Sequence, residues 1–221
     1  MFLILRNASI VYAASKSSLS FQSSRCLVVN QQTGKIVANL DEGEASQDLL
    51  SPFQPCTTRH LLPSQIIIPG LVDTHVHAPQ FSFVGTGLDL PLLDWLNKYT
   101  FPSEAKFSDL EFAKKVYEKS ANSHTRNGTT TICYFGTLHL EATKLLAHII
   151  DRKGIRGFVG KVCMDTNSPA FYCESSSETS VQETREFIEH LKVANSSVVP
   201  VITPRFAPTC TSQLMNGLGN Q

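Results

Sequence analysis

The sequence lacks several features that would point to particular classes of protein. Its six cysteines include no C-x-x-C pair, which argues against a structural zinc site and against a compact disulfide framework. Lysine plus arginine equals aspartate plus glutamate at 19 each, so no net charge attracts nucleic acid or an acidic membrane surface. No apolar run approaches the length of a membrane span. We therefore expect neither nucleic acid nor a membrane as a partner.

The N-terminus also lacks the pattern of a secretory signal. Its apolar run, residues 1–5, ends at Arg6 and has no basic segment before it. The six cysteines are then expected to be reduced thiols, and the expected location is cytoplasmic. With 42% hydrophobic and 17% charged residues over 221 positions, the composition is that of a globular chain of one or two domains.

Residues 1–62 are predicted to form a small β domain. Short runs rich in β-branched and aromatic residues lie at 2–5, 9–12, 26–29 and 35–40. Between the second and third runs, the serine-rich residues 13–24 predict a mobile loop. Residues 42–55 are polar and predict no defined element.

Two histidines at alternate positions follow a short apolar run at residues 65–68, which predicts a strand that leads into a turn. In an extended segment, residues i and i+2 point to the same face, so His75 and His77 face the same way. Neutral imidazole is a good zinc or iron ligand, and a catalytic zinc keeps one position open for water. The pair predicts a metal site, with Asp73 on the same face as a supporting group. A satisfied histidine pair beside a turn is the alternative.

Helical and β-branched segments alternate in the rest of the chain. The pattern predicts helices over 108–126, 141–152, 180–191 and 212–218, and strands over 129–135, 156–164 and 198–203. Residues 81–107 predict a long connection of the kind that often serves as a binding loop or lid. The alternative is that its apolar residues pack on the barrel or on another subunit. Strands joined by crossover helices form a parallel sheet, so the predicted fold class is α/β, most simply part of a (β/α)8 barrel.

The number of strand and helix units indicates half a barrel. Strands near 65, 129, 156 and 198 give four units in residues 63–221. Four parallel strands cannot close on themselves and would leave two apolar edges open. The sequence therefore predicts a fragment or a shortened isoform of a barrel protein.

Three stretches carry a resemblance to a known family. PGLVDTHVH, at residues 69–77, resembles the first-strand signature of the amidohydrolase superfamily. DLPLLDWL at 89–96 and VGKVCMD at 159–165 are similar to the guanine deaminases of that superfamily. The resemblance runs from about residue 69 to the end of the chain. It implies a (β/α)8 barrel beside a small β-sandwich that is built from both chain ends.

The resemblance also implies an activity and a set of site residues. The activity is zinc-dependent hydrolytic deamination of guanine to xanthine and ammonia, with one zinc ion per active site and a homodimer in the full-length form. His75 and His77 would be metal ligands, while Gln80, Arg205 and Phe206 would contact the base. Arginine offers fixed donors to an oxo group, and phenylalanine offers an apolar face to a flat purine. Without the resemblance, Arg205 would be interpreted as an ion-pair residue and Gln80 as a solvated loop residue.

Other candidate residues keep a structural interpretation. His139 follows a predicted strand and could approach the pocket, but we do not assign it as a ligand. Cys133 and Cys163 lie within apolar strands and predict buried small residues rather than nucleophiles.

The sequence departs from the family in one respect. The later metal histidines, the H-x-x-E segment with its catalytic glutamate and the metal-binding aspartate belong to a second half that this sequence does not contain. We therefore expect no catalytic residue here beyond the metal ligands, and no activity of this chain alone. One alternative is a non-catalytic shortened subunit that binds a full-length partner. Another is an amidohydrolase for a different ring, such as a hydantoin or a chlorinated triazine, against which residues 89–96 and the pair Arg205 and Phe206 argue.

Overall fold

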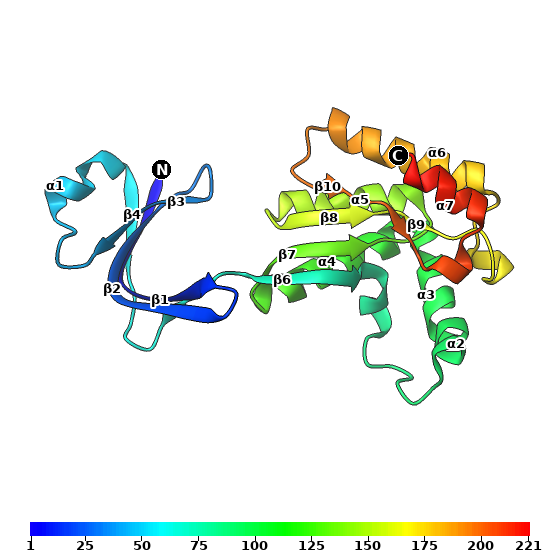
Figure 1. Cartoon of the computed structure of the whole chain (residues 1–221), viewed down its shortest axis with the longest axis horizontal. Helices are drawn as coiled ribbons and strands as arrows, with labels where there is room; N and C mark the ends of the chain where they lie inside the picture. Colours follow the sequence, from blue (N-terminus) through cyan, green and yellow to red (C-terminus); the bar gives the residue numbers. More distant parts are fainter. The chain divides into compact units, whose positions relative to one another are not determined.

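A long antiparallel hairpin organises the first of the chain's two units, Met1–Pro69. In the computed structural model, which describes all 221 residues, β1 covers Phe2–Ser15 and β2 covers Ser18–Asn30 (Figure 1). The hydroxyl groups of Ser15 and Ser18 lie 2.7 Å apart beside the turn. The prediction of a mobile loop over 13–24 is wrong, because pairing across the hairpin outweighs the weak strand preference of serine.

The rest of this unit completes one five-stranded sheet. β3 (Lys35–Asp41) pairs with β2, and β4 (Cys56–His60) pairs in parallel with β1. A short helix, α1 (Gln47–Leu50), is capped by the Ser46 side chain and lies within the segment 42–55, for which no element was predicted. Its Leu50 packs in a small core with residues of the first two strands, Ile4, Cys26 and Val28.

The prediction that the apolar run at 65–68 forms the first strand of the barrel is wrong. β5 (Ile66–Ile67) pairs with β1 of the first unit instead. The first barrel strand is β6 (Leu71–His77), so both histidines lie at the end of that strand rather than after it. The error arose because an apolar run between two prolines looks the same whichever sheet it joins.

The second unit, Gly70–Gln221, is built on a parallel sheet. Its strands follow the order β10-β8-β7-β6, with β7 at Thr129–Phe135, β8 at Arg156–Gly160 and β10 at Val199–Pro200. A second ladder joins β9 (Val162–Cys163) to β11 (Thr203–Pro204). The predicted fold class, α/β with part of a parallel barrel sheet, agrees with this strand order. β6 and β10 are edge strands, so the sheet does not close.

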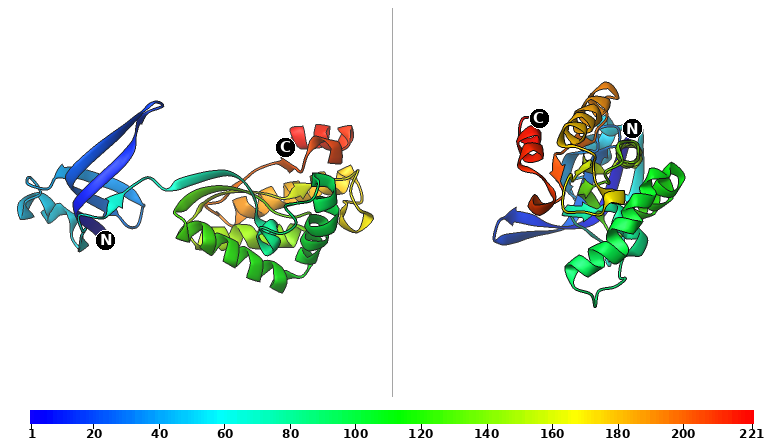
Figure 2. Two further views of the ribbon diagram at one scale, coloured as in Figure 1. Left: turned by 90° about the horizontal axis from the view of Figure 1, so that it is seen from below. Right: turned by 90° about the vertical axis from the view of Figure 1, so that its right-hand side faces the viewer.

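Three long helices cover one face of this sheet (Figure 2). They are α4 (Leu110–Arg126), α5 (Leu140–Arg152) and α6 (Ser177–Val193), and α7 (Ser212–Gly219) packs beside α6. The core between helices and strands includes the buried side chains of Ile132, Tyr134 and Val159 from the sheet and Tyr117, Leu146 and Phe187 from the helices. No helix of the structure combines the length and the apolar character that a membrane span requires.

Two helices begin at other residues than predicted: α4 begins at Leu110 rather than at 108, and α6 begins at Ser177 rather than at 180. The N-cap of α4 is Asp109, whose carboxylate accepts hydrogen bonds from the backbone of Glu111 and Phe112. The N-cap of α6 is Ser176, whose hydroxyl accepts a hydrogen bond from the backbone of Thr179. A carboxylate at a helix N-terminus satisfies free N–H groups and also interacts with the helix dipole. Asp109 thus stabilises the first turn of α4.

The segment predicted as a long irregular connection is largely helical. Short turns follow one another: η2 (Ala78–Phe83), α2 (Leu92–Trp95), a π-helical turn (Leu96–Thr100), α3 (Phe101–Ala105) and η4 (Lys106–Ser108). The Trp95 indole donates a hydrogen bond to the carbonyl of Thr86 at 2.9 Å. The sequence does not predict these turns, because none is long enough to show a helical period. Their consequence for the site is that α3 holds a buried carboxylate, Glu104.

We expect Gly160→Ala to destabilise the second unit. A Cβ at Gly160 would lie 2.6 Å from the carbonyl oxygen of Val201 and closer still to the side chain of Thr203. Because the backbone of Val201 cannot yield cheaply, the substitution should cost about 1–3 kcal/mol in free energy of unfolding. Urea unfolding followed by circular dichroism measures it.

Gly219→Ala is the matched control in the same unit, since no heavy atom lies within 4 Å of a Cβ there. It should change the free energy of unfolding by less than about 0.5 kcal/mol. Equal effects of the two substitutions would contradict the close approach at Gly160.

Candidate functional site

The histidine pair lies at the carboxyl end of β6. The two imidazole rings have centroids 5.1 Å apart and planes inclined at 74°. Val76, between them in sequence, packs into the core under the helices. Because side chains alternate across a strand, His75 and His77 face away from the helices, as their spacing predicts. His75 is exposed and His77 is half-buried.

Phe135 forms one wall beside this pair. It ends β7, where its backbone pairs with that of His77. Its ring centroid lies 4.8 Å from each imidazole centroid. Asp73 supports the pair through the backbone, since its carboxylate accepts a hydrogen bond from the His75 N–H at 3.2 Å. Both rings are thus held in place from the strand and from its neighbour.

His77 is held as a neutral imidazole. Its Nδ1 is buried without a hydrogen-bond partner. Burial lowers the pKa of His77 to about 3, and the positive charges of Arg205 and His75 act in the same direction. The structure therefore brings Arg205 close enough to the pair to affect its protonation, although the two positions are far apart in sequence.

Arg205 follows β11 and is fixed by a buried ion pair. Its backbone N–H donates to the carbonyl of Cys163 at 3.0 Å. Its Nη1 lies 2.6 Å from Oε2 of Glu104, and its Nη2 lies 3.1 Å from Oε1. The two side chains are only 5% and 0% exposed. The guanidinium carbon lies 5.4 Å from the centroid of the Phe101 ring.

Tyr172 lies beside this ion pair and contacts the loop that contains Leu138. Its side chain is buried, and burial raises its pKa, an effect that the negative charge of Glu104 increases. Its hydroxyl accepts a hydrogen bond from the N–H of Leu138 at 3.3 Å, and its ring centroid lies 6.0 Å from that of Phe101. The sequence does not indicate a role for Glu104 or Tyr172 in the site. Glu104 and Arg205 are 101 positions apart, and no local pattern links them.

A second buried ion pair shapes the loop that carries Tyr172. The Lys161 side chain is 0% exposed and binds Glu174, which is 5% exposed. The other oxygen of Glu174 accepts a hydrogen bond from the N–H of Met164 at 2.7 Å. The loop that contains Tyr172 is therefore fastened at both of its ends to the strand region of the barrel.

The remaining predicted residues lie near the ends of the same strands. Gln80 is half-buried in η2, three residues beyond His77. Phe206 directly follows Arg205 and is 45% exposed. His139 lies at the N-cap position of α5 without a side-chain hydrogen bond to the helix, and its Nε2 is buried and unpartnered. Cys163 is buried as predicted, and burial raises the pKa of its thiol.

The structure brings together two candidate metal ligands and no more. No group of three or more His, Cys, Asp or Glu side chains is placed to hold a metal ion. A catalytic zinc has three protein ligands or more, so His75 and His77 could supply only part of such a set.

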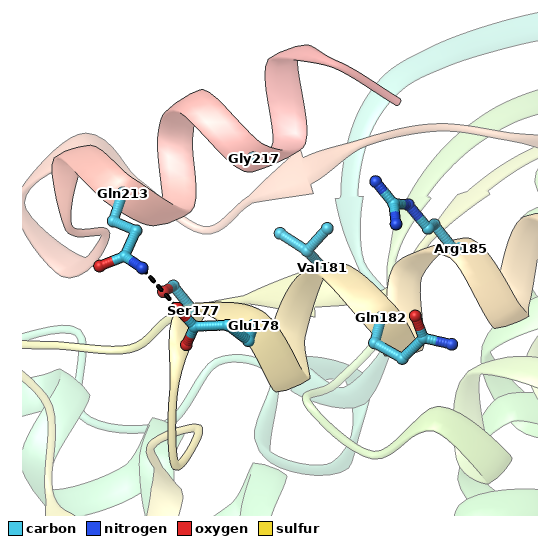
Figure 3. Close-up of a pocket in the computed structure, with 7 residues that line it drawn as sticks. All are labelled: Ser177, Glu178, Val181, Gln182, Arg185, Gln213 and Gly217. Atoms are coloured by element: carbon cyan, nitrogen blue, oxygen red, sulfur yellow. Dashed lines mark hydrogen bonds between the residues drawn. The ribbon is translucent and has the colours of Figure 1, made fainter.

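A pocket between α6 and α7 lies apart from these residues (Figure 3). Across it, the side-chain amide of Gln213 donates a hydrogen bond to the carboxylate of Glu178. It is lined by Ser177, Glu178, Val181, Gln182, Arg185, Gln213 and Gly217. None of the predicted site residues is among them, so this pocket is not part of the candidate site.

Comparison with known proteins places this geometry in a family. The amidohydrolase family matches residues 66–220. Guanine deaminase of Rattus norvegicus is 48% identical over 191 residues, which cover 85% of this chain and 42% of the relative. Guanine deaminase of Dictyostelium discoideum is 54% identical over 158 residues, or 71% of this chain and 35% of that protein.

Solved structures agree with this assignment. The crystal structure of guanine deaminase from C. acetobutylicum with bound guanine in the active site has a TM-score of 0.86 and 35% identity, covering 100% of this chain and 50% of that one. This chain thus spans half or less of the length of these relatives. The strand-end histidines, the half-barrel sheet and the family match lead to one conclusion: the chain belongs to the amidohydrolase family.

Proposed function

We propose that this chain forms the N-terminal half of a guanine deaminase site, which hydrolyses guanine to xanthine and ammonia. The observation that carries the proposal is that Arg205, which Glu104 fixes, lies close enough to the histidines at the carboxyl ends of the parallel strands to help lower the pKa of His77. In barrels of this kind, these strand ends form the active site. The likeness to guanine deaminases, one of them with bound guanine, supports guanine as the substrate.

The histidine pair fits a zinc ion. Its His77 has a buried ring nitrogen without a partner, and its depressed pKa keeps the ring unprotonated at neutral pH. Metal ligation requires neutral imidazole. Zinc, when bound, would activate water for attack on the amino-bearing carbon of guanine. His75 and His77 would supply two of the ligands, and Phe135 would shield their rings from water on one side.

Three further residues would bind and orient the base. The Glu104 carboxylate occupies one N–H on each Nη of Arg205, which leaves three of the five guanidinium N–H groups free for the oxo oxygen of guanine. Phe206 offers a partly exposed ring as an apolar face for the purine. Gln80 offers an amide that both donates and accepts at the edge of the ring. Together they favour a flat heterocycle with an oxo group.

A non-catalytic subunit is the second candidate function. It is supported by the two unpaired edges of the sheet, β6 and β10. Leu71 and Val72 on β6 are 52% and 63% exposed. Such edges pair readily with other strands. Co-purification with a longer homologous chain would favour this candidate.

For either candidate, the proposal includes a cytoplasmic location, which the six unpaired cysteines support, and a homodimer of the full-length form.

We expect the 221-residue chain with added zinc to form no xanthine from guanine. A longer chain that continues through the second half of the barrel should form it. In that longer chain, Arg205→Ala should lower kcat/KM by about 100-fold, which corresponds to about 2.7 kcal/mol of lost transition-state binding. Release of xanthine, followed by its ultraviolet absorbance, is the measurement. Full activity of the short chain would show that two histidines suffice.

The buried neutral state of His77 predicts a loss of stability in acid. Its pKa is about 3 when folded, below its usual 6.5, so between these values the unfolded chain binds more protons and the folded state weakens as the pH falls. At pH 5 this amounts to at most about 2 kcal/mol of unfolding free energy relative to pH 7.

Urea unfolding of the wild type and of His77→Gln at pH 7 and pH 5, with a chelator present, measures the contribution of His77 to the unfolding free energy. The loss between the two pH values should be smaller in His77→Gln, because glutamine does not titrate. An identical loss of unfolding free energy in both proteins would show that folding does not lower the pKa of His77.

A further inference from the structure

Glu104 is the one carboxylate that forms an ion pair with Arg205. Both of its oxygens are engaged, and its side chain is fully buried in α3. A bidentate pair of this kind fixes the plane of the guanidinium as well as its position. The direction in which Arg205 presents its three free N–H groups is therefore set by Glu104 rather than by the substrate.

Aromatic side chains hold this pair from the sides. The Phe101 ring lies 5.4 Å from the guanidinium carbon, and Phe101 and Tyr172 pack together at 6.0 Å. Phe101 and Glu104 belong to the same short helix, α3. The carboxylate is thus placed by a rigid element, as a precise binding group requires.

The pair also decides the charge that a ligand meets. An unpaired buried arginine would be a strong attractor for anions, since charges interact strongly where water is excluded. With Glu104 ionised, the pair is neutral overall, and its free N–H groups act as oriented dipoles. A neutral oxo group is then a better match than an anionic ring.

We propose that Glu104 is a positioning residue that orients Arg205 and cancels its charge, so that the site selects a neutral oxopurine over an anionic one. This rests on the proposed function, since it assigns Arg205 to the base. It adds a determinant of specificity outside the residues that would touch the substrate.

The orientation can be tested without any ligand. Nuclear magnetic resonance of the 221-residue chain, with Arg205→Lys for assignment, should show separate and slowly exchanging Nη signals for Arg205. They should merge in Glu104→Gln. The matched control is Glu186→Gln, which removes a carboxylate from an ion pair with Lys144 that lies between two helices and should leave the Arg205 signals separate. Separate signals in Glu104→Gln would overturn the proposal.

The selectivity is tested by calorimetric titration of the 221-residue chain with guanine and with urate, a purine that is anionic at pH 7. In Glu104→Gln, the preference for guanine over urate should fall by about 100-fold or more, because a bare cation replaces a neutral pair. In Glu186→Gln this preference should stay within about twofold of the wild type. A wild-type preference retained by Glu104→Gln would overturn the proposal.

Glu104→Asp separates the two roles and serves if Glu104→Gln fails to fold. Aspartate keeps the charge but falls short by one methylene, so guanine binding should weaken about 3- to 10-fold without a gain for urate. A gain for urate would contradict the charge argument. If the wild type binds no guanine, the proposed function fails for this chain, and the Arg205 signals still decide the positioning role.

Discussion

The buried ion pair between Glu104 and Arg205 is the interaction on which the candidate site depends. It joins the helical segment after the first barrel strand to the end of the last strand, across 101 positions of sequence. Removing one partner of such a pair leaves a buried charge without compensation, which costs about 3–5 kcal/mol. The pair therefore constrains both elements, and through the charge of Arg205 it also affects the protonation of His77.

A parallel sheet explains why so few residues create a site. Each strand of the second unit ends at the same edge, so His77, Phe135 and Arg205 come together from strands that are distant in sequence. The helices occupy the other face and bury Ile132 and Tyr134 there. Because side chains alternate along each strand, the neighbouring residues point to the opposite face. His75 and His77 on β6 therefore lie on the face away from the helices.

Buried charge in this unit is arranged in pairs. Lys161 with Glu174 fastens the loop that carries Tyr172, and Glu104 with Arg205 fastens the end of β11. Pairs of well-packed apolar residues would often give equal or greater stability. What the ionic pairs add is direction, because a bidentate contact fixes an angle as well as a distance. Orientation, more than stability, is what a binding arginine requires.

The sequence by itself determined the alternation of strands and helices, the shared face of His75 and His77 and the family, because these depend on local periodicity and on contiguous motifs. Only the tertiary structure decided that residues 66–67 join the first sheet, that the serine-rich stretch forms a hairpin and that Glu104 holds Arg205. Each of these depends on a partner far away in the chain. Local pattern carries no information about which distant strand or charge a residue will meet.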